Sequence, residues 1–172
     1  LEKLGYAVTR GVGKTGVMGV IRGAEHGPVL MLRADMDALP FRNDDGSIEA
    51  VHACGHDSHC AMVLAAASEL AGRVRRGTLK ILFQPAEEGV RGAAGMAASG
   101  ILDDADYFLG AHIAMMCKSG EVSVNPYGFL CTTKLDVTYT GRPAHAGVEP
   151  NAGHNAMAAA CNAFVQLLGI AR

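Results

Sequence analysis

His52-Ala53-Cys54-Gly55-His56-Asp57 brings a thiol, two imidazoles and a carboxylate together within six residues. An apolar run, Ala61 to Leu70, follows it and is typical of a buried helix. Because Cys54 and His56 lie two positions apart, one metal ion can take both only if the backbone between them is extended or turned, and the intervening glycine allows that. An alternative interpretation is a simple turn, in which Asp57 caps the helix and the cysteine is a small buried residue.

The composition is that of an ordinary globular protein. The chain has 172 residues, of which 49% are hydrophobic, and this is enough to form a core. A formal net charge of −2 with mixed signs gives no electrostatic case for nucleic acid or an anionic membrane. No apolar run approaches the roughly 20 residues that span a bilayer. The five cysteines are odd in number and unpatterned, which favours free thiols and predicts a cytoplasmic protein.

Both ends of the sequence are typical of interrupted helices. Leu1 to Leu4 has the character of the last turn of a helix, and the chain stops within an Ala-rich helical pattern, Ala156 to Ile170. We therefore expect this chain to be the N-terminal part of a longer protein.

A glycine-rich segment near the start matches a nucleotide-binding pattern. The run is Gly11-Val12-Gly13-Lys14-Thr15-Gly16, which fits the dinucleotide fingerprint and imitates the end of a phosphate loop. A phosphate loop requires glycine where Val8 stands, and either motif should open a helix. The residues that follow, Val17 to Arg22, are typical of a strand instead. We expect a hairpin between two strands, with nucleotide binding as an alternative function.

From there, buried-type strands alternate with helices. The expected elements, in chain order, are a strand at 29–32, a helix after Asp57, a strand at 79–83, a helix at 93–98 and a strand at 107–109. This alternation is typical of right-handed crossovers and predicts an α/β fold, with a mainly parallel sheet flanked by helices on both faces.

Residues that bind metals or move protons follow the predicted strands. They are Asp35, Asp37, Glu87, Glu88 and His112. Because the carboxyl ends of parallel strands meet at one edge of a sheet, we expect them to lie together, with Cys54 and His56 beside them. Adjacent carboxylates beside a metal suit a division of labour, in which one binds the ion and the other moves protons. Taken singly, the two glutamates are consistent with a solvated pair and His112 with a core histidine.

The remaining chain predicts a second, smaller unit. We expect a linker over residues 117–128, a strand over Phe129 to Thr140 and a helix from Asn155. Between them, a Gly-Arg-Pro turn precedes His145, which is either a functional residue or an ordinary loop histidine. The predicted domains are a metal-binding domain over 1–120 and the start of a smaller domain over 121–172.

Five ordered blocks of the sequence resemble one protein family. They are Arg33 to Pro40, His52 to Asp57, Phe83 to Gly89, Gly110 to His112 and Gly141 to Ala146. The family is that of metal-dependent amidohydrolases and peptidases, which includes carboxypeptidase G, hippurate hydrolase and plant auxin-conjugate hydrolases. Three further stretches look most like its p-aminobenzoyl-glutamate hydrolases, namely Glu88 to Ala93, Asp103 to Phe108 and Cys131 to Lys134.

The resemblance implies a zinc-exopeptidase-like catalytic domain and an α+β lid or dimerisation domain, both incomplete here. It also implies a role for each residue of the site. The metal ligands would be Cys54, His56, Glu88 and His112. Glu87 would be the general acid and base, Asp35 and Asp37 would orient a ligand, and His145 would stabilise the oxyanion across a dimer. The late histidine ligand of this family is not in the sequence.

The function implied by the resemblance is hydrolysis of the amide bond of N-acyl or N-aroyl amino acids, with substrates like p-aminobenzoyl-glutamate favoured. It would use two divalent ions, zinc or manganese, because the thiolate suits zinc whereas carboxylates and imidazoles also suit manganese. The expected partner is an identical or related subunit bound through the lid domain, with no nucleic acid and no membrane. The alternative is a non-catalytic metal-binding or interaction module. Two departures from the family pattern are Ser58 and Cys60, which replace its usual Gly and Thr.

Overall fold

The computed structural model describes residues 1–89, 91–113, 117–124 and 135–170. The chain divides into two compact units, Leu1–Val122 and Ser123–Arg172. The assignment of residues 1–120 and 121–172 to a catalytic and a lid domain stays a prediction. Among the described residues, none of the helices has both the length and the apolar character needed to cross a lipid bilayer.

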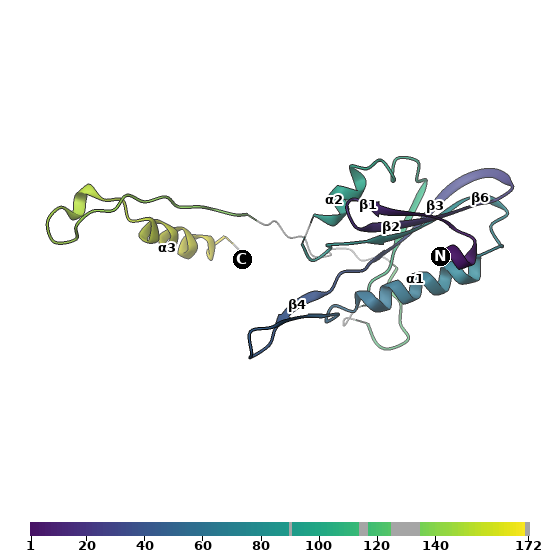
Figure 1. Ribbon diagram of the computed structural model, residues 1–172, viewed down its shortest axis with the longest axis horizontal. Coiled ribbons are helices and arrows are strands. Elements are labelled where there is room, and N and C mark those ends of the chain that lie inside the picture. The colour runs from purple at the N-terminus through teal and green to yellow at the C-terminus, as the bar shows by residue number, and fades with distance from the viewer. Residues whose placement is uncertain (90, 114–116, 125–134, 171–172) are drawn as a thin grey trace. The chain divides into compact units, whose positions relative to one another are not determined.

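In the described part of the first unit, five strands form one sheet in the order β1-β2-β6-β3-β7 (Figure 1). Their bounds are β1 Ala7–Val12, β2 Gly16–Arg22, β3 Glu25–Asp35, β6 Arg76–Gln84 and β7 Tyr107–Gly110. Strand β3 pairs in parallel with β6 and β7, but β1, β2 and β6 pair antiparallel. The parallel arrangement predicted for the strands at 29–32, 79–83 and 107–109 is confirmed, but the sheet as a whole is mixed and not mainly parallel. The sheet is mixed because β1 and β2 are joined by a tight turn, which forces an antiparallel pair that then adds to β6.

The glycine-rich segment forms the turn of this β1–β2 hairpin, as predicted. Gly13 and Lys14 have φ angles of 56° and 93°, the left-handed values that a tight hairpin turn requires. A Cβ on Gly13 would lie 2.8 Å from Met96, so the turn also needs glycine for close packing. Strand β2 follows the motif where nucleotide binding requires a helix.

Two helices cover opposite faces of the sheet (Figure 1). Helix α1, His56–Leu70, packs through Ala67 on one core cluster, whose other buried members are Tyr6, Ala34, Leu79, Ile81 and Phe83. Helix α2, Gly92–Ala97, packs through Met96 on the second cluster, which also holds Val12, Met31 and Leu82. Ile81 and Leu82 are adjacent in β6 and belong to different clusters, because successive residues of a strand point to opposite faces. Burial of each such side chain contributes roughly 1.5–3 kcal/mol.

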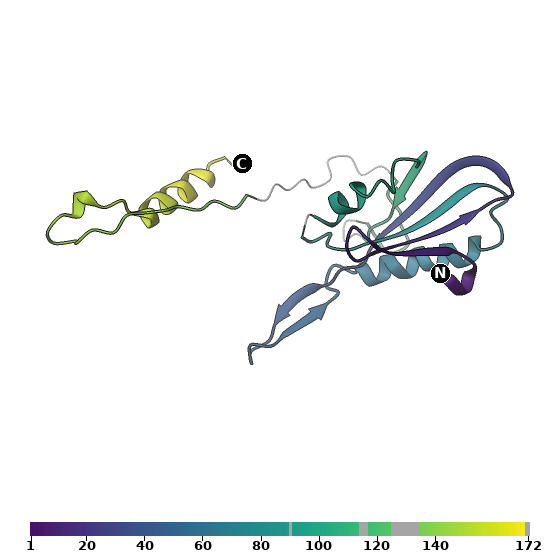
Figure 2. The ribbon, with the colours of Figure 1, turned by 45° about the horizontal axis from the view of Figure 1, so that its top comes forward.

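A second, two-stranded sheet lies between Asp37 and Cys54 in the chain. Strands β4, Leu39–Arg42, and β5, Ile48–Val51, pair antiparallel and extend away from the five-stranded sheet (Figure 2). In the turn, Asn43 N–H donates to the Ser47 carbonyl over 2.9 Å. Sequence reasoning missed this hairpin, although the turn-forming residues at 43–47 were its signal.

The short 3₁₀ helix η1, Glu2–Leu4, precedes β1 in the first unit. The second unit contains the 3₁₀ helix η2, Pro150–Ala152, and helix α3, Ala156–Leu167. The predicted helix is confirmed, and Asn155 caps it by accepting a hydrogen bond of 3.0 Å from Ala158 N–H.

The strand predicted over Phe129 to Thr140 is only partly testable. Residues 129–134, which include the Cys131 to Lys134 match, lie outside the described residues, as does Pro126 to Gly128 of the predicted linker. Residues 135–140 have no strand structure, so the prediction is wrong there. A strand needs a hydrogen-bonded partner. In the described part of this unit, the recorded pairing is a single bridge between Arg142 and His154.

Candidate metal centre

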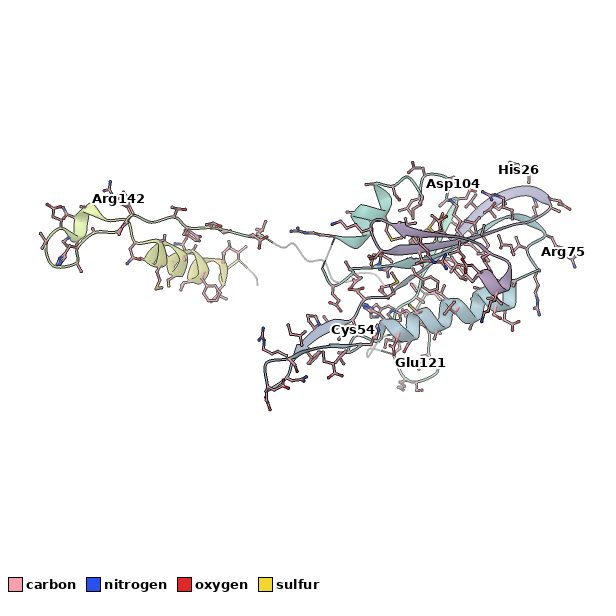
Figure 3. The ribbon with its side chains drawn as sticks, in the orientation of Figure 1. His26, Cys54, Arg75, Asp104, Glu121 and Arg142 are labelled. Carbon is pink, nitrogen blue, oxygen red and sulfur yellow. The ribbon has the colours of Figure 1, made fainter. Side chains whose placement is uncertain are left out.

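The candidate site lies at the carboxyl ends of the three parallel strands. Strands β3, β6 and β7 end at Asp35, Gln84 and Gly110, and helix α1 begins beside them at His56. Figure 3 shows Cys54 at this N-terminal end of α1. The crossover connections of parallel strands bring loops far apart in sequence to one edge, which is where ligands bind in such sheets.

Three predicted ligands converge there. One ligand atom each from Cys54, His56 and Glu88 lies within 4.8 Å of the other two. The distance from His56 Nε2 to Glu88 Oε1 is 3.9 Å. Gly55 has φ 77°, and this left-handed conformation turns the chain so that residues on either side of it reach the same point.

The hydrogen bond of His56 fixes its tautomer. Its Nδ1 lies 3.0 Å from the carbonyl oxygen of Asp37, which only accepts hydrogen bonds, so Nδ1 carries the proton. The lone pair is therefore on Nε2. This atom is fully buried and has no hydrogen-bond partner among the described residues. Such an unmet group costs roughly 1–3 kcal/mol, so Nε2 of His56 fits a role as a metal ligand.

Carboxylates surround this nitrogen. Nε2 of His56 lies 3.8 Å from Asp35 Oδ2, 3.9 Å from Glu87 Oε2 and 3.9 Å from Glu88 Oε1. Asp35 also pairs with Arg33, and a divalent cation at this point would be attracted by all three carboxylates. The electrostatics and the donor types therefore both suit a metal ion.

The Cys54 thiol responds to the same negative charge. A hydrogen bond with Glu88, burial, and the charges of Glu88, Glu87 and Asp37 raise its pKa above the ordinary value. Carboxylates disfavour the thiolate, whereas a bound cation favours it strongly enough to deprotonate a coordinating thiol.

Asp37 holds the two glutamates in place. Its Oδ1 accepts a hydrogen bond of 3.0 Å from Glu87 N–H, and its Oδ2 accepts one of 3.1 Å from Glu88 N–H. The preceding Ala86 has φ 52°, an unfavourable conformation for a residue with a side chain. The two hydrogen bonds to Asp37 stabilise this strained turn and fix the backbone positions of both glutamates.

His112 joins the site through a second group, formed with Asp35, His56 and His59, whose ligand atoms also lie within 4.8 Å of one another. Its ring centre lies 5.7 Å from that of His56 and 4.3 Å from that of His59. Nδ1 of His112 lies 2.6 Å from the Ile113 carbonyl oxygen, which places its lone pair on Nε2, as in His56.

Asp35 is fully buried and ionised. Burial opposes ionisation, but the hydrogen bond from His59 and the charge of Arg33, whose Nη1 donates over 2.8 Å, keep its pKa below the ordinary value. Sequence reasoning did not identify His59. The available signal was its spacing of three from His56, which places both imidazoles on one face of a helix.

His145 lies in the second unit, where it is exposed and its Nδ1 accepts a hydrogen bond of 3.1 Å from Gly147 N–H. Its role in catalysis stays a prediction.

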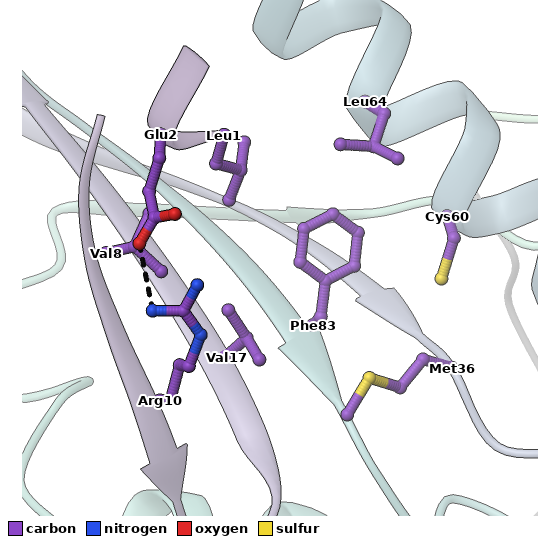
Figure 4. Close-up of a pocket in the computed structure, with 9 residues that line it drawn as sticks. All are labelled: Leu1, Glu2, Val8, Arg10, Val17, Met36, Cys60, Leu64 and Phe83. Atoms are coloured by element: carbon purple, nitrogen blue, oxygen red, sulfur yellow. Dashed lines mark hydrogen bonds and ion pairs between the residues drawn. The ribbon is translucent and has the colours of Figure 1, made fainter. Parts of the chain in front are cut away.

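A cavity of about 350 Å³ lies elsewhere in the first unit (Figure 4). Its walls are mostly apolar and include Met36, Leu64 and Phe83, with an ion pair of 2.9 Å between Arg10 and Glu2 among its lining residues. None of the predicted metal ligands lines it, so this cavity is distinct from the metal site.

Comparison with known proteins gives a consistent result. Residues 31–171 match peptidase family M20/M25/M40. The chain is 45% identical to a p-aminobenzoyl-glutamate hydrolase homolog of Haemophilus influenzae, over 93% of this chain and 41% of that protein. It is 42% identical to the indole-3-acetyl-aspartic acid hydrolase of Enterobacter agglomerans, over 92% of this chain and 40% of that protein. It thus spans about two fifths of the length of these relatives.

Solved structures also resemble it. One is a Bacillus subtilis protein described as a dinuclear metal binding peptidase from the M20 family, with TM-score 0.58 and 36% identity over 65% of this chain and 34% of that one. Another is an aminobenzoyl-glutamate utilization protein from Klebsiella pneumoniae, with TM-score 0.53 and 30% identity over 66% of this chain and 36% of that one.

Proposed function

Because this chain belongs to peptidase family M20/M25/M40, we propose that it carries the metal site of an enzyme that hydrolyses the amide bond of N-acyl or N-aroyl amino acids. Substrates like p-aminobenzoyl-glutamate are favoured. The two relatives above are named for p-aminobenzoyl-glutamate and indole-3-acetyl-aspartic acid. Both compounds join an aromatic acyl group to an acidic amino acid.

The observation that carries this proposal is the buried Nε2 of His56, which has no hydrogen-bond partner among the described residues and lies near carboxylates and a thiol. Cys54, His56, Glu88 and His112 would hold divalent ions, zinc or manganese. Bound there, two such ions would polarise the scissile carbonyl and lower the pKa of an attacking water.

Glu87 is proposed to move the protons. Its side chain is 42% exposed, so substrate and water can reach it, and its Oε2 lies only 3.9 Å from Nε2 of His56. The hydrogen bond from its backbone N–H to Asp37 holds the start of this side chain beside the metal site. Glu87 would take a proton from water and deliver it to the leaving amine, a contribution of roughly a hundred- to ten-thousandfold.

The remaining predicted residues support these groups. Asp35 and Asp37 would hold the ligands in position, which usually affects metal affinity nearly as much as a ligand does. His145 would stabilise the oxyanion from a lid domain, and the partner bound through that domain would be an identical or related subunit. The free thiols of Cys54, Cys60, Cys117 and Cys161 support the proposal of a cytoplasmic enzyme.

The test is to assay the full-length protein against a panel of N-acyl and N-aroyl amino acids, including p-aminobenzoyl-glutamate, and to count its bound metal. Cys54→Ser should lower both metal content and hydrolysis. Cys161→Ser, which changes an exposed thiol in α3, is the matched control and should lower neither. If the wild-type protein bound no more than one ion and hydrolysed nothing, the non-catalytic alternative would replace this proposal.

A further inference from the structure

His59 belongs to a group of possible metal ligands, but its contacts indicate another role. We infer that His59 is a positioning residue that joins Asp35 to the backbone beyond β7, and that it is not a metal ligand. This inference rests on the proposed function, since what His59 would position are residues of the metal site.

Both ring nitrogens of His59 already have partners. The Asp35 carboxylate, which accepts, lies at Nδ1, so Nδ1 carries the proton and donates. Nε2 accepts a hydrogen bond of 2.9 Å from Ile113 N–H. A neutral imidazole has one donor and one acceptor nitrogen, and this pair of bonds uses both. His59 therefore has no lone pair left for a cation, in contrast to His56.

The bond to Ile113 fixes the segment that carries His112. Ile113 also packs on Gly55, where an added Cβ would lie 2.1 Å from Ile113 Cδ1. The chain beyond β7 thus contacts the start of α1 twice, once through a hydrogen bond and once through close packing. These contacts set His112 at its ring-centre distance of 5.7 Å from His56.

The bond to Asp35 fixes the other side of the site. The carboxylate accepts from His59 through Oδ1 and from Arg33 through Oδ2. With both oxygens held, Oδ2 stays 3.8 Å from Nε2 of His56. The register of β3 with β7 ends at Arg33 and Gly110. His59 therefore links the residues that follow β3 and β7, beyond the point where these two strands stop pairing through their backbones.

Three substitutions separate the two hydrogen bonds. Asn at position 59 places an amide donor near the Nδ1 position and does not reach Ile113. Gln places an amide oxygen near the Nε2 position and does not donate to Asp35. Leu removes both bonds.

The first measurement is hydrogen exchange at Ile113 N–H in the metal-free full-length protein. Exchange should be at least about tenfold faster in His59→Leu and His59→Asn, and close to wild type in His59→Gln. The amides of Leu32 and Ile81 in the central strands report general opening and should change little. Equal exchange at Ile113 in the Asn and Gln variants would overturn the inference, and this comparison stands even if the Leu variant fails to fold.

The second measurement is metal binding by competition with a chelator. We expect affinity for Zn²⁺ to fall about 10- to 100-fold in His59→Leu, with unchanged stoichiometry at saturation, because this is typical when a ligand's support is lost. Loss of one ion at saturation would show that His59 is a ligand and overturn the inference. A wild-type protein that bound no metal would overturn the proposed function, while the Ile113 exchange would still decide whether His59 holds that segment.

Discussion

Both ends of the parallel strands are rich in polar residues, but the two ends differ in how far these residues are buried and in whether they have hydrogen-bond partners. At the amino ends, Arg22, His26, Arg75 and Arg76 are exposed, and Figure 3 shows His26 and Arg75 far along the strands from Cys54. Polar side chains at this end form hydrogen bonds with the backbone. Arg76 Nε donates to the His26 carbonyl over 3.0 Å, and Asp106 Oδ2 accepts from Val29 N–H over 2.8 Å.

At the carboxyl ends, three polar side chains that lie close together are buried. His56, His59 and Asp35 are each at most 1% exposed, and Nε2 of His56 has carboxylates nearby but no hydrogen-bond partner in the described chain. Density of polar residues therefore does not distinguish the two ends. Burial does, together with the ring nitrogen of His56 that has no hydrogen-bond partner among the described residues, and both identify the carboxyl end as the one suited to a cation.

The largest effect is expected at Glu87. Glu87→Gln in the full-length protein should lower turnover by roughly a hundred- to ten-thousandfold, because the amide cannot accept the proton, while metal content stays near wild type. Steady-state kinetics and metal analysis check this, with Glu69→Gln on the exposed face of α1 as control. Loss of metal from Glu87→Gln would mean that the roles of Glu87 and Glu88 are exchanged.

The next effect compares histidines from opposite ends of the strands. His56→Ala should weaken Zn²⁺ affinity by more than about 100-fold, since removal of a ligand exceeds the 10- to 100-fold typical of its supporting residues. His26→Ala should leave affinity unchanged, because His26 is exposed at the far end. Chelator competition measures both, and similar losses would contradict the difference drawn between the two ends.

A smaller effect is expected for Asp37, which accepts from two backbone amides. Asp37→Asn replaces one accepting oxygen with a donor, so it should free one glutamate N–H and lower metal affinity about 10- to 100-fold. Asp106→Asn makes the same chemical change at the amino ends and should leave metal affinity unaltered. Equal metal affinity in Asp37→Asn and Asp106→Asn would contradict the role given to Asp37.

The smallest effect concerns a charged pair away from both ends, Lys80 with Asp104. The hydrogen bond from Lys80 keeps the pKa of Asp104 below its ordinary value of 3.8. The pair therefore contributes stability above that pH and loses it as the pH falls through the lowered pKa. Asp104 is 62% exposed, and the buried Lys80 keeps its hydrogen bond to the Ile101 carbonyl, so Asp104→Asn should cost about 1 kcal/mol at pH 7. Denaturant unfolding at pH 7 and near pH 2 should show the difference shrinking at low pH, and a growing difference would contradict this.

Sequence reasoning worked best where the determining pattern is local. The apolar run before Leu70 predicts α1, and the residues after each strand predict the convergence of Cys54, His56 and Glu88, because parallel strands end together. The mixed sheet was not predicted. The β1–β2 hairpin pairs with β6, a strand far away in the sequence, and the residues of the hairpin do not indicate this partner.

The spacing of His59 from His56 was visible in the sequence, but its contact with Ile113 was not, for a similar reason. Its partner Ile113 is 54 residues away and contributes a backbone N–H, which any residue except proline supplies. No side-chain pattern could reveal that contact. The β4–β5 hairpin was missed because each strand has only four residues and is largely exposed, so hydrophobic alternation is weak.

The most direct test of the metal centre is X-ray absorption at the zinc edge of the zinc-loaded full-length protein. If Cys54 is a ligand, a sulfur scatterer should appear at about 2.3 Å from the zinc, the usual Zn–S distance. It should disappear in Cys54→Ser and remain in Cys161→Ser. A first coordination sphere of nitrogen and oxygen alone in the wild-type protein would contradict the assignment of Cys54, and with it the metal centre described at the strand ends.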